Sequence, residues 1–161
     1  MIRATQVLRA GSWQAAPADR ITLSYDQRHR RRLRFVAEAG TEFLLDLPRT
    51  TVLRGGEGLQ LEDGRIILVA AAAEPLLEVR CNDPQHLVRV AWHLGNRHLP
   101  AQITTGRILI REDSVIEDML KGLGAAVRHV DEAFTPEPGA YDSSHSAVFA
   151  PGHSAHGHGH G

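Results

Sequence analysis

In the second half of the chain, the spacing of apolar residues switches repeatedly between the period of a strand and the period of a helix. Residues 76–81 alternate in part, which predicts a strand. Asn82 or Asp83 then caps a helix that has Pro84 in its first turn, because these side chains accept hydrogen bonds from free backbone N–H groups and the missing N–H of proline is not needed there. The helix must stop before Pro100, which cannot continue it.

The same alternation continues towards the C-terminus. Residues 102–104 and 107–110 flank a turn sequence and are expected to form a hairpin. Ser114, with Glu117 three residues later, is a capping box that opens a second helix. A final strand is expected at residues 126–130. The order strand, helix, strand, strand, helix, strand is that of the split βαβ or ferredoxin-like unit, an antiparallel sheet with two helices on one face.

The first half of the chain contains short apolar runs without a sustained helical period. Turn-forming residues separate these runs, and the Asp63 and Gly64 pair predicts a tight hairpin between two of them. About six short strands in this length of chain indicate a small sandwich or barrel. The strands are expected at residues 4–8, 21–25, 32–36, 42–46, 58–61 and 66–69.

The predicted fold class is therefore α+β, with two folded domains and a tail. Residues 1–73 are expected to form an N-terminal all-β domain, and residues 76–135 a ferredoxin-like domain. Residues 71–75 are expected to link them, because Pro75 interrupts the strand pattern. Residues 136–161 are rich in Gly, Ser, Pro and His and cannot bury enough apolar surface to fold, which predicts a disordered His-rich tail.

The composition narrows the class of protein. Hydrophobic residues make up 42% of the chain and charged residues 23%, which is typical of a soluble protein with a packed core. The formal net charge of −1 gives no general reason to bind nucleic acid or a membrane, and the longest apolar run, residues 66–73, is too short to span a bilayer. The lone Cys81 excludes an internal disulfide, and the N-terminus lacks the apolar region of a signal peptide, so we expect a cytoplasmic protein.

A basic cluster at residues 28–34 contains five arginines. It fits either an RNA- or protein-binding adaptor or the solvated tip of a hairpin. Few aromatic residues lie nearby to stack on bases, and the charge of the rest of the chain is balanced. We therefore favour the solvated tip, with docking onto an acidic protein partner as the main exception, and keep the adaptor as the alternative function.

The histidines of the first predicted helix differ in the face that they occupy. With about 100° of rotation per residue, His86 and His93 fall on the polar face, where we expect solvated side chains. His98 projects onto the apolar arc, where a histidine is more often a hydrogen-bonded core residue than a metal ligand. That arc is formed by the apolar residues of the helix: Leu87, Val88, Val90, Ala91, Trp92 and Leu94.

A metal site at His98 needs further ligands, because Ni²⁺, Cu²⁺ and Zn²⁺ bind imidazole but take about four to six donors. A two-fold dimer would bring two copies of His98 together. The tail would add imidazoles, and the interleaved glycines would let several of them turn towards one ion; an inert tail or a purification tag is the alternative, and Cys81 is expected to be inert. The predicted metal ligands are His98 and the tail histidines His153, His156, His158 and His160, with His145 as a further tail imidazole.

Residues 93–98 read His-Leu-Gly-Asn-Arg-His, a stretch that resembles the signature of the urease accessory protein UreE family. Residues 43–48 and 117–120 resemble an N-terminal strand and the second helix of that family. The His-rich tail is also similar. The resemblance covers residues 1 to about 134 and the character of the tail.

The resemblance implies a homodimeric nickel metallochaperone that delivers Ni²⁺ during urease maturation and is not an enzyme. It implies that the N-terminal domain binds a partner, that the ferredoxin-like domain dimerises, and that His98 of both protomers meets at the interface. Zn²⁺ or Cu²⁺ would also bind in vitro. The implied partners are the urease accessory GTPase and apo-urease with its accessory proteins, with no nucleic acid and no membrane.

One departure from the family pattern concerns a secondary metal site. Some members carry His-x-His just before the second helix, whereas this chain has Glu112, Asp113 and Ser114 there. We therefore expect no such site, and expect Glu112 and Asp113 to stabilise the helix N-terminus through the helix dipole. A hydrolytic metalloenzyme is disfavoured because the chain lacks a His-Glu-x-x-His pattern.

Overall fold

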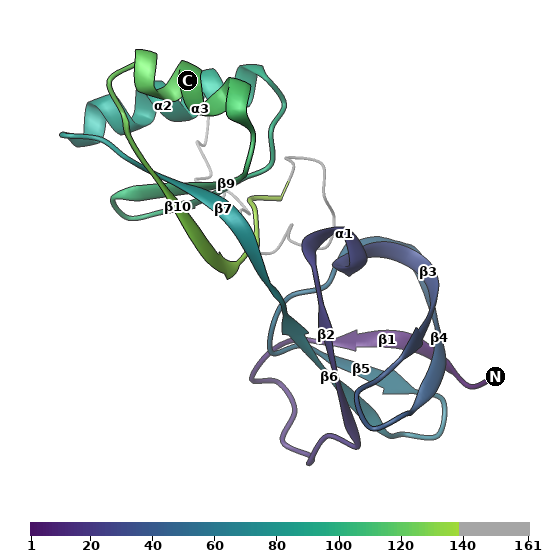
Figure 1. The fold of residues 1–161 in the computed structure, drawn as a ribbon. Coiled ribbons are helices and arrows are strands. Elements are labelled where there is room, and N and C mark those ends of the chain that lie inside the picture. The colour runs from purple at the N-terminus through teal and green to yellow at the C-terminus, as the bar shows by residue number, and fades with distance from the viewer. Residues whose placement is uncertain (139–161) are drawn as a thin grey trace, which may run out of the picture.

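The computed structural model describes residues 1–138, which form two β-sheets and three helices (Figure 1). One sheet is formed by the N-terminal half of the chain, which has no long helix. The other sheet is formed by the C-terminal half, which also contains two helices. The predicted α+β fold class is confirmed. In the described part of the chain, no helix is long and apolar enough to cross a membrane.

The N-terminal half is one curled six-stranded sheet rather than two packed sheets. Its strand order is β2-β6-β5-β1-β4-β3, and the short helix α1 (Tyr25–Arg28) lies between β2 and β3. The strands are β1 (Arg3–Leu8), β2 (Asp19–Leu23), β3 (His29–Val36), β4 (Glu42–Val52), β5 (Gly58–Leu61) and β6 (Ile66–Ala71).

Alternation along β4 explains how this sheet forms its core. Phe43, Leu45 and Leu47 are buried, while the residues between them are only half-buried, as expected when successive side chains point to opposite faces. The predicted hairpin between β5 and β6 is confirmed, because Gly64 has a φ of 90° and its N–H donates to the Leu61 carbonyl at 2.9 Å.

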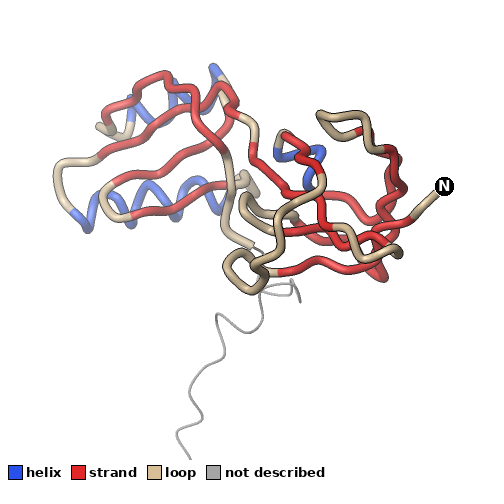
Figure 2. The backbone as a smooth tube through the Cα atoms, turned by 90° about the horizontal axis from the view of Figure 1, so that it is seen from below, coloured by secondary structure: helices blue, strands red, loops and turns tan. Residues whose placement is uncertain are grey.

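The C-terminal half has the predicted ferredoxin-like order of elements. Its strands are β7 (Ala73–Arg80), β8 (Ala101–Thr104), β9 (Arg107–Arg111) and β10 (Ala126–Ala133), in the sheet order β10-β7-β9-β8. The helices α2 (Pro84–Asn96) and α3 (Ser114–Gly122) cover one face of this sheet, and the other face has no helix (Figures 1 and 2).

The covered face is apolar because the facing side chains of strands and helices form one buried cluster. Val79 of β7 and Ile108 of β9 are fully buried against Val90 of α2 and Leu120 of α3. The first turn of α2 is capped as predicted, since the Asp83 carboxylate accepts a hydrogen bond from the His86 N–H at 2.7 Å.

Two local predictions are wrong by a few residues. The expected linker at residues 71–75 is a single residue, Ala72, because β7 begins at Ala73 and includes Pro75. Pro75 is tolerated there because β9 pairs with β7 only from Leu76 onward, so the missing N–H breaks no hydrogen bond on that side.

The cap of α3 also differs from the prediction. Asp113, not Ser114, is the N-cap residue, and its carboxylate accepts hydrogen bonds from the N–H groups of Val115 and Ile116 at 2.9 and 3.1 Å. A carboxylate at this position satisfies two free N–H groups and also interacts favourably with the helix dipole.

Arg28 lies buried where the two halves of the chain meet. Its guanidinium donates hydrogen bonds to the carbonyl oxygens of Leu23, Leu53 and Phe134, the last of which follows β10. The prediction of an exposed basic cluster is therefore wrong for Arg28, because these carbonyls replace the water that it loses. The other four arginines of residues 28–34 are exposed on β3, which is an edge strand.

The predicted domain limits at residues 73, 76 and 135 stay predictions. Most of the expected tail lies outside the described residues, including every tail histidine named above. The structure describes residues 136–138 of the expected tail. This short segment is hydrogen-bonded to β8, because the Glu137 N–H donates to the Ala101 carbonyl at 2.8 Å.

Candidate metal-binding site

The backbone places His98 just beyond the end of α2, in an unusual conformation. The N–H of His98 donates to the Gly95 carbonyl at 3.0 Å, and the N–H of Leu99 donates to the Leu94 carbonyl at 3.4 Å. These two bonds form a Schellman motif, in which the residue at the position of His98 has a positive φ and is usually glycine. Among the described residues, His98 is the one non-glycine residue with a positive φ, at 55°.

The left-handed backbone conformation of His98 is strained. A side chain in the left-handed region costs about 1–2 kcal/mol relative to a right-handed helical residue. Such strain persists when the surrounding structure enforces it, and it is found most often at functional sites. Glycine would adopt this conformation without strain, yet the chain has a histidine at this position.

The imidazole of His98 is exposed, which corrects the expectation that it projects onto the apolar arc of the helix. The helical angle does not apply, because α2 ends at Asn96 and His98 lies beyond it with a positive φ, while the next residue, Leu99, packs against the core. The His98 side chain makes no hydrogen bond with any residue in the range 1–138, so its ring nitrogens face solvent or a further ligand.

An apolar stripe lies on the same helix. Val88 and Trp92 are one turn apart on α2, and their side chains are 68% and 64% exposed. They belong to the predicted apolar arc, but the residues of α2 that are buried in the core are Val90 and Leu94. Beyond Trp92 the stripe continues to Gly95, where an added Cβ atom would meet no neighbouring side chain within 4 Å. Exposed apolar surface of this kind is typical of protein interfaces.

The segment after β10 is hydrogen-bonded to β8, the strand that follows His98 in the sequence. The Thr135 N–H donates to the Gln102 side-chain oxygen at 2.9 Å, and the Glu137 N–H donates to the Ala101 carbonyl at 2.8 Å. Ala101 is three residues after His98 in the sequence. The segment that leads to the predicted tail ligands is therefore bonded to β8, the strand that begins three residues after His98.

The two histidines expected on the polar face of α2 occupy different surroundings. His86 is half-buried, and its Nε2 atom is 2.7 Å from the Leu123 carbonyl at the end of α3, so the expectation of a solvated side chain is wrong for His86. This contact satisfies a carbonyl that the helix end leaves free. His93 packs edge-on against the Trp92 ring, with ring centroids 5.1 Å apart.

Sequence reasoning missed the interactions of His129. Its Nδ1 and Nε2 atoms lie 2.6 Å from Glu112 and 2.8 Å from Glu117, respectively. The hydrogen bond with Glu112 is the main cause that raises the pKa of His129 above its ordinary value. Because the two ring nitrogens point in opposite directions, the two carboxylates and the imidazole bind each other rather than one shared ion.

Cys81 is a weak ligand candidate. Its side chain is half-buried, and burial raises the pKa of the thiol, which disfavours the thiolate that binds metals. Within residues 1–138, no group of three or more His, Cys, Asp or Glu side chains is placed to hold a metal ion.

Comparison with known proteins identifies the family. Residues 2–72 match the family model of the UreE urease accessory protein, N-terminal domain, and residues 74–161 match that of the UreE urease accessory protein, C-terminal domain. The chain belongs to the UreE urease accessory protein family.

Relatives in the UreE family agree over almost the full length of the chain. The urease accessory protein UreE of Bradyrhizobium sp. (strain ORS 278) is 59% identical over 147 residues, which cover 91% of this chain and 70% of that protein. The urease accessory protein UreE of Chelativorans sp. (strain BNC1) is 53% identical over 99% of this chain and 98% of that protein. The resemblance stated from residues 93–98 is thereby confirmed.

Proposed function

We propose that this UreE-family protein is a nickel metallochaperone, in which His98 of two protomers forms the core of a Ni²⁺ site at a dimer interface. The observation that carries this proposal is the exposed imidazole of His98, held in a left-handed conformation beyond the end of α2. Neutral imidazole nitrogen is a suitable ligand for Ni²⁺. Nickel is the cargo of the protein, and no chemistry on a substrate is involved.

The apolar stripe of α2 supports a dimer. A two-fold axis near the end of α2 would bury Val88 and Trp92 against their symmetry mates and bring both copies of His98 together. Burying a large apolar side chain contributes about 1.5–3 kcal/mol. The interface would therefore form without metal and present a pair of imidazoles to the ion.

The tail would complete the ligand set. Two imidazoles do not satisfy Ni²⁺, and the tail offers more of them at His153, His156, His158 and His160. The hydrogen bond between Glu137 and Ala101 holds the start of the tail at the strand that follows His98. A tail with the disorder predicted from its composition would reach back to His98.

The division between fixed and mobile ligands suits a carrier. The pair of His98 side chains would hold the ion, while the tail imidazoles would dissociate one at a time. A partner can then replace each lost ligand, so the ion passes on without being released to water. We propose that the receiving partners are the urease accessory GTPase and apo-urease with its accessory proteins, in the cytoplasm.

Calorimetric titration of the full-length protein with Ni²⁺ tests this function. The variant His98→Ala should lose the tight binding step, because it removes both interfacial ligands of the dimer at once. His93→Ala is the matched control, since it removes an imidazole of the same signature that packs against Trp92. Tight binding that persists in His98→Ala, or that is lost equally in His93→Ala, would refute the proposed site.

A further inference from the structure

The face of the C-terminal sheet that the helices leave uncovered is polar at its centre. Leu77 and Val79 of β7 point into the helix-covered core, so Glu78 and Arg80 point to the open face. Glu78 pairs in register with Arg128 of β10. The open face therefore brings charged side chains from several strands together, on the side of the sheet opposite to α2 and α3.

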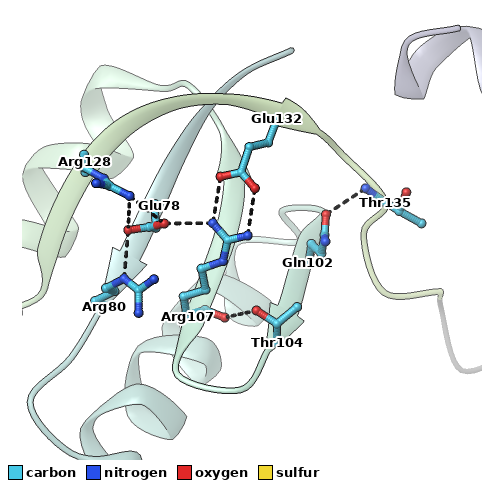
Figure 3. A network of polar contacts seen from close by, with 8 residues as sticks. All are labelled: Glu78, Arg80, Gln102, Thr104, Arg107, Arg128, Glu132 and Thr135. Carbon is cyan, nitrogen blue, oxygen red and sulfur yellow. Dashed lines mark hydrogen bonds and ion pairs between the residues drawn. The ribbon is translucent and has the colours of Figure 1, made fainter. Parts of the chain in front are cut away.

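Glu78 is surrounded by three arginines (Figure 3). Its carboxylate accepts hydrogen bonds from Arg80 at 2.9 Å, Arg107 at 2.8 Å and Arg128 at 3.2 Å. The Glu78 side chain is only 3% exposed. Arg107 is satisfied on its other side by two hydrogen bonds of 2.8 Å to Glu132.

Arg80 and Arg128 retain hydrogen-bonding capacity. Each uses one nitrogen towards Glu78, and no other residue in the described part of the chain accepts a hydrogen bond from either guanidinium. Their side chains are 55% and 70% exposed. Among the described residues, Glu78 is the one carboxylate with which Arg80 and Arg128 form an ion pair, and they share it.

A hollow of about 340 Å³ lies beside these two arginines, lined by Glu78, Arg80, Ala126, Val127 and Arg128. The last three lining residues belong to β10, the edge strand of the sheet. In residues 1–138 no strand pairs with the outer edge of β10, so its backbone N–H and C=O groups are available there. An exposed edge of this kind can accept an added strand.

We propose that this open face docks an extended acidic segment of a protein partner, whose carboxylates bind the free N–H groups of Arg80 and Arg128 while its backbone pairs with β10. Guanidinium groups favour carboxylates because their parallel N–H donors match the two oxygens. A nucleic acid fits less well, since no aromatic residue lines the hollow to stack on a base. The docking face itself does not depend on the proposed function. Only the further step, that the acidic partner takes part in urease maturation, rests on it.

A labelled peptide of alternating Glu and Val is the probe, and fluorescence anisotropy with the full-length protein is the measurement. The double variant Arg80→Gln with Arg128→Gln should bind the peptide about tenfold more weakly, because two charge-assisted contacts are lost. The matched control is Arg20→Gln with Arg65→Gln, two exposed arginines of the N-terminal half with the same change in net charge. The control should bind like the unchanged protein.

Several results would overturn the docking face. These are equal weakening in both double variants, equal binding of a Gln and Val peptide, and tighter binding of single-stranded RNA that depends on Arg80 and Arg128. If the double variant does not fold, hydrogen exchange of the unchanged protein decides: the peptide should slow exchange in β10, and unchanged exchange there would refute the proposal.

Nickel binding separates this inference from the proposed function. The Arg80 and Arg128 double variant should bind Ni²⁺ like the unchanged protein, because the open face and the end of α2 are different regions of the domain. Failure of the unchanged protein to bind Ni²⁺ would refute the metallochaperone and leave the peptide result standing. Loss of nickel binding in the double variant alone would contradict the independence of the two surfaces.

Discussion

At the scale of single residues, the conformation of His98 is the feature that joins structure and proposed function. A Schellman motif favours glycine at this position, and the chain has an imidazole there instead. A residue that is suboptimal for the fold and suited to ligation indicates a trade of stability for function. The two properties can be separated by substitution.

The substitution His98→Gly should stabilise the metal-free protein by about 0.5–1 kcal/mol, because relief of the left-handed strain exceeds the added entropy of the unfolded chain. The same change should abolish tight nickel binding. Chemical denaturation measures the first effect and calorimetry the second. His98→Ala is the control, since it keeps the Cβ atom and therefore the strain; a glycine variant no more stable than the alanine variant would contradict the argument.

The charge of Glu78 provides a second prediction at this scale. Hydrogen bonding from Arg80, followed by that from Arg107, lowers the pKa of Glu78 to about 2. A carboxyl whose pKa is lowered by folding stabilises the protein above its unfolded pKa of 4.5, and this stabilisation is lost as the pH falls towards 2. The contribution should therefore be complete at neutral pH.

Glu78→Gln should lower the free energy of unfolding by about 1–2 kcal/mol at neutral pH, a value between those of exposed and buried ion pairs. The difference from the unchanged protein should shrink as the pH falls through this acid range, which denaturation at a series of pH values would show. Glu42→Gln is the control, because Glu42 is an exposed carboxylate paired with Arg34 at 3.3 Å. A difference that does not depend on pH would contradict the role of the Glu78 charge.

At the scale of elements, α2 has two apolar surfaces and only one of them is used inside the chain. Val90 and Leu94 are buried against the sheet, while Val88 and Trp92 face outwards. A surface helix normally has a polar outer face. The outward stripe runs towards the helix end where His98 lies, so dimerisation and metal binding would depend on the same element.

Trp92→Glu should make the metal-free protein monomeric if it forms the proposed dimer, because a carboxylate in an apolar interface loses its hydration. Light scattering coupled to size exclusion gives the mass. Val36→Glu serves as the control, since Val36 is 56% exposed but lies on β3 of the other sheet. Persistence of the dimer in Trp92→Glu, or its loss in Val36→Glu, would place the interface elsewhere.

At the scale of the whole molecule, the two halves are held together by α1. The Tyr25 ring packs edge-on against Phe134 at a centroid distance of 5.6 Å, and Asp26 pairs with Arg111 of β9 at 2.9 Å. Arg28 donates a hydrogen bond to the Phe134 carbonyl. These contacts fix the segment that follows β10, and through it the point from which the tail leaves the fold.

Truncation after Gly139 should reduce the number of Ni²⁺ ions bound per dimer and leave one ion at the interface, because it removes the proposed tail ligands and leaves the proposed His98 pair in place. Calorimetry and metal analysis give the stoichiometry. A full-length variant with His153, His156, His158 and His160 changed to Gln is the matched control and should behave like the truncation. Loss of all binding on truncation would contradict the division between fixed and mobile ligands.

Much of the fold follows from local rules in the sequence. The Asp83 cap and Pro84 start α2, Pro100 follows its end, and the turn at Gly64 joins two strands. The order of elements in the C-terminal half could be predicted for the same reason. The spacing of apolar residues differs between a helix and a strand, so it indicates which of the two forms locally. The family resemblance likewise rests on short stretches of sequence, of which residues 93–98 are the specific one.

Burial and contacts between residues far apart in the sequence were decided by the tertiary structure, because local sequence rules do not include them. The burial of Arg28 depends on carbonyls as far away in sequence as Phe134, and the contact of His86 with Leu123 depends on how two helices pack. Helical periodicity marks Trp92 and Val90 as equally apolar, but only the packed sheet selects which of them is covered. The exposure of His98 is decided where the helix ends, because His98 lies in the Schellman turn beyond Asn96 and the next residue, Leu99, packs against the core in its place.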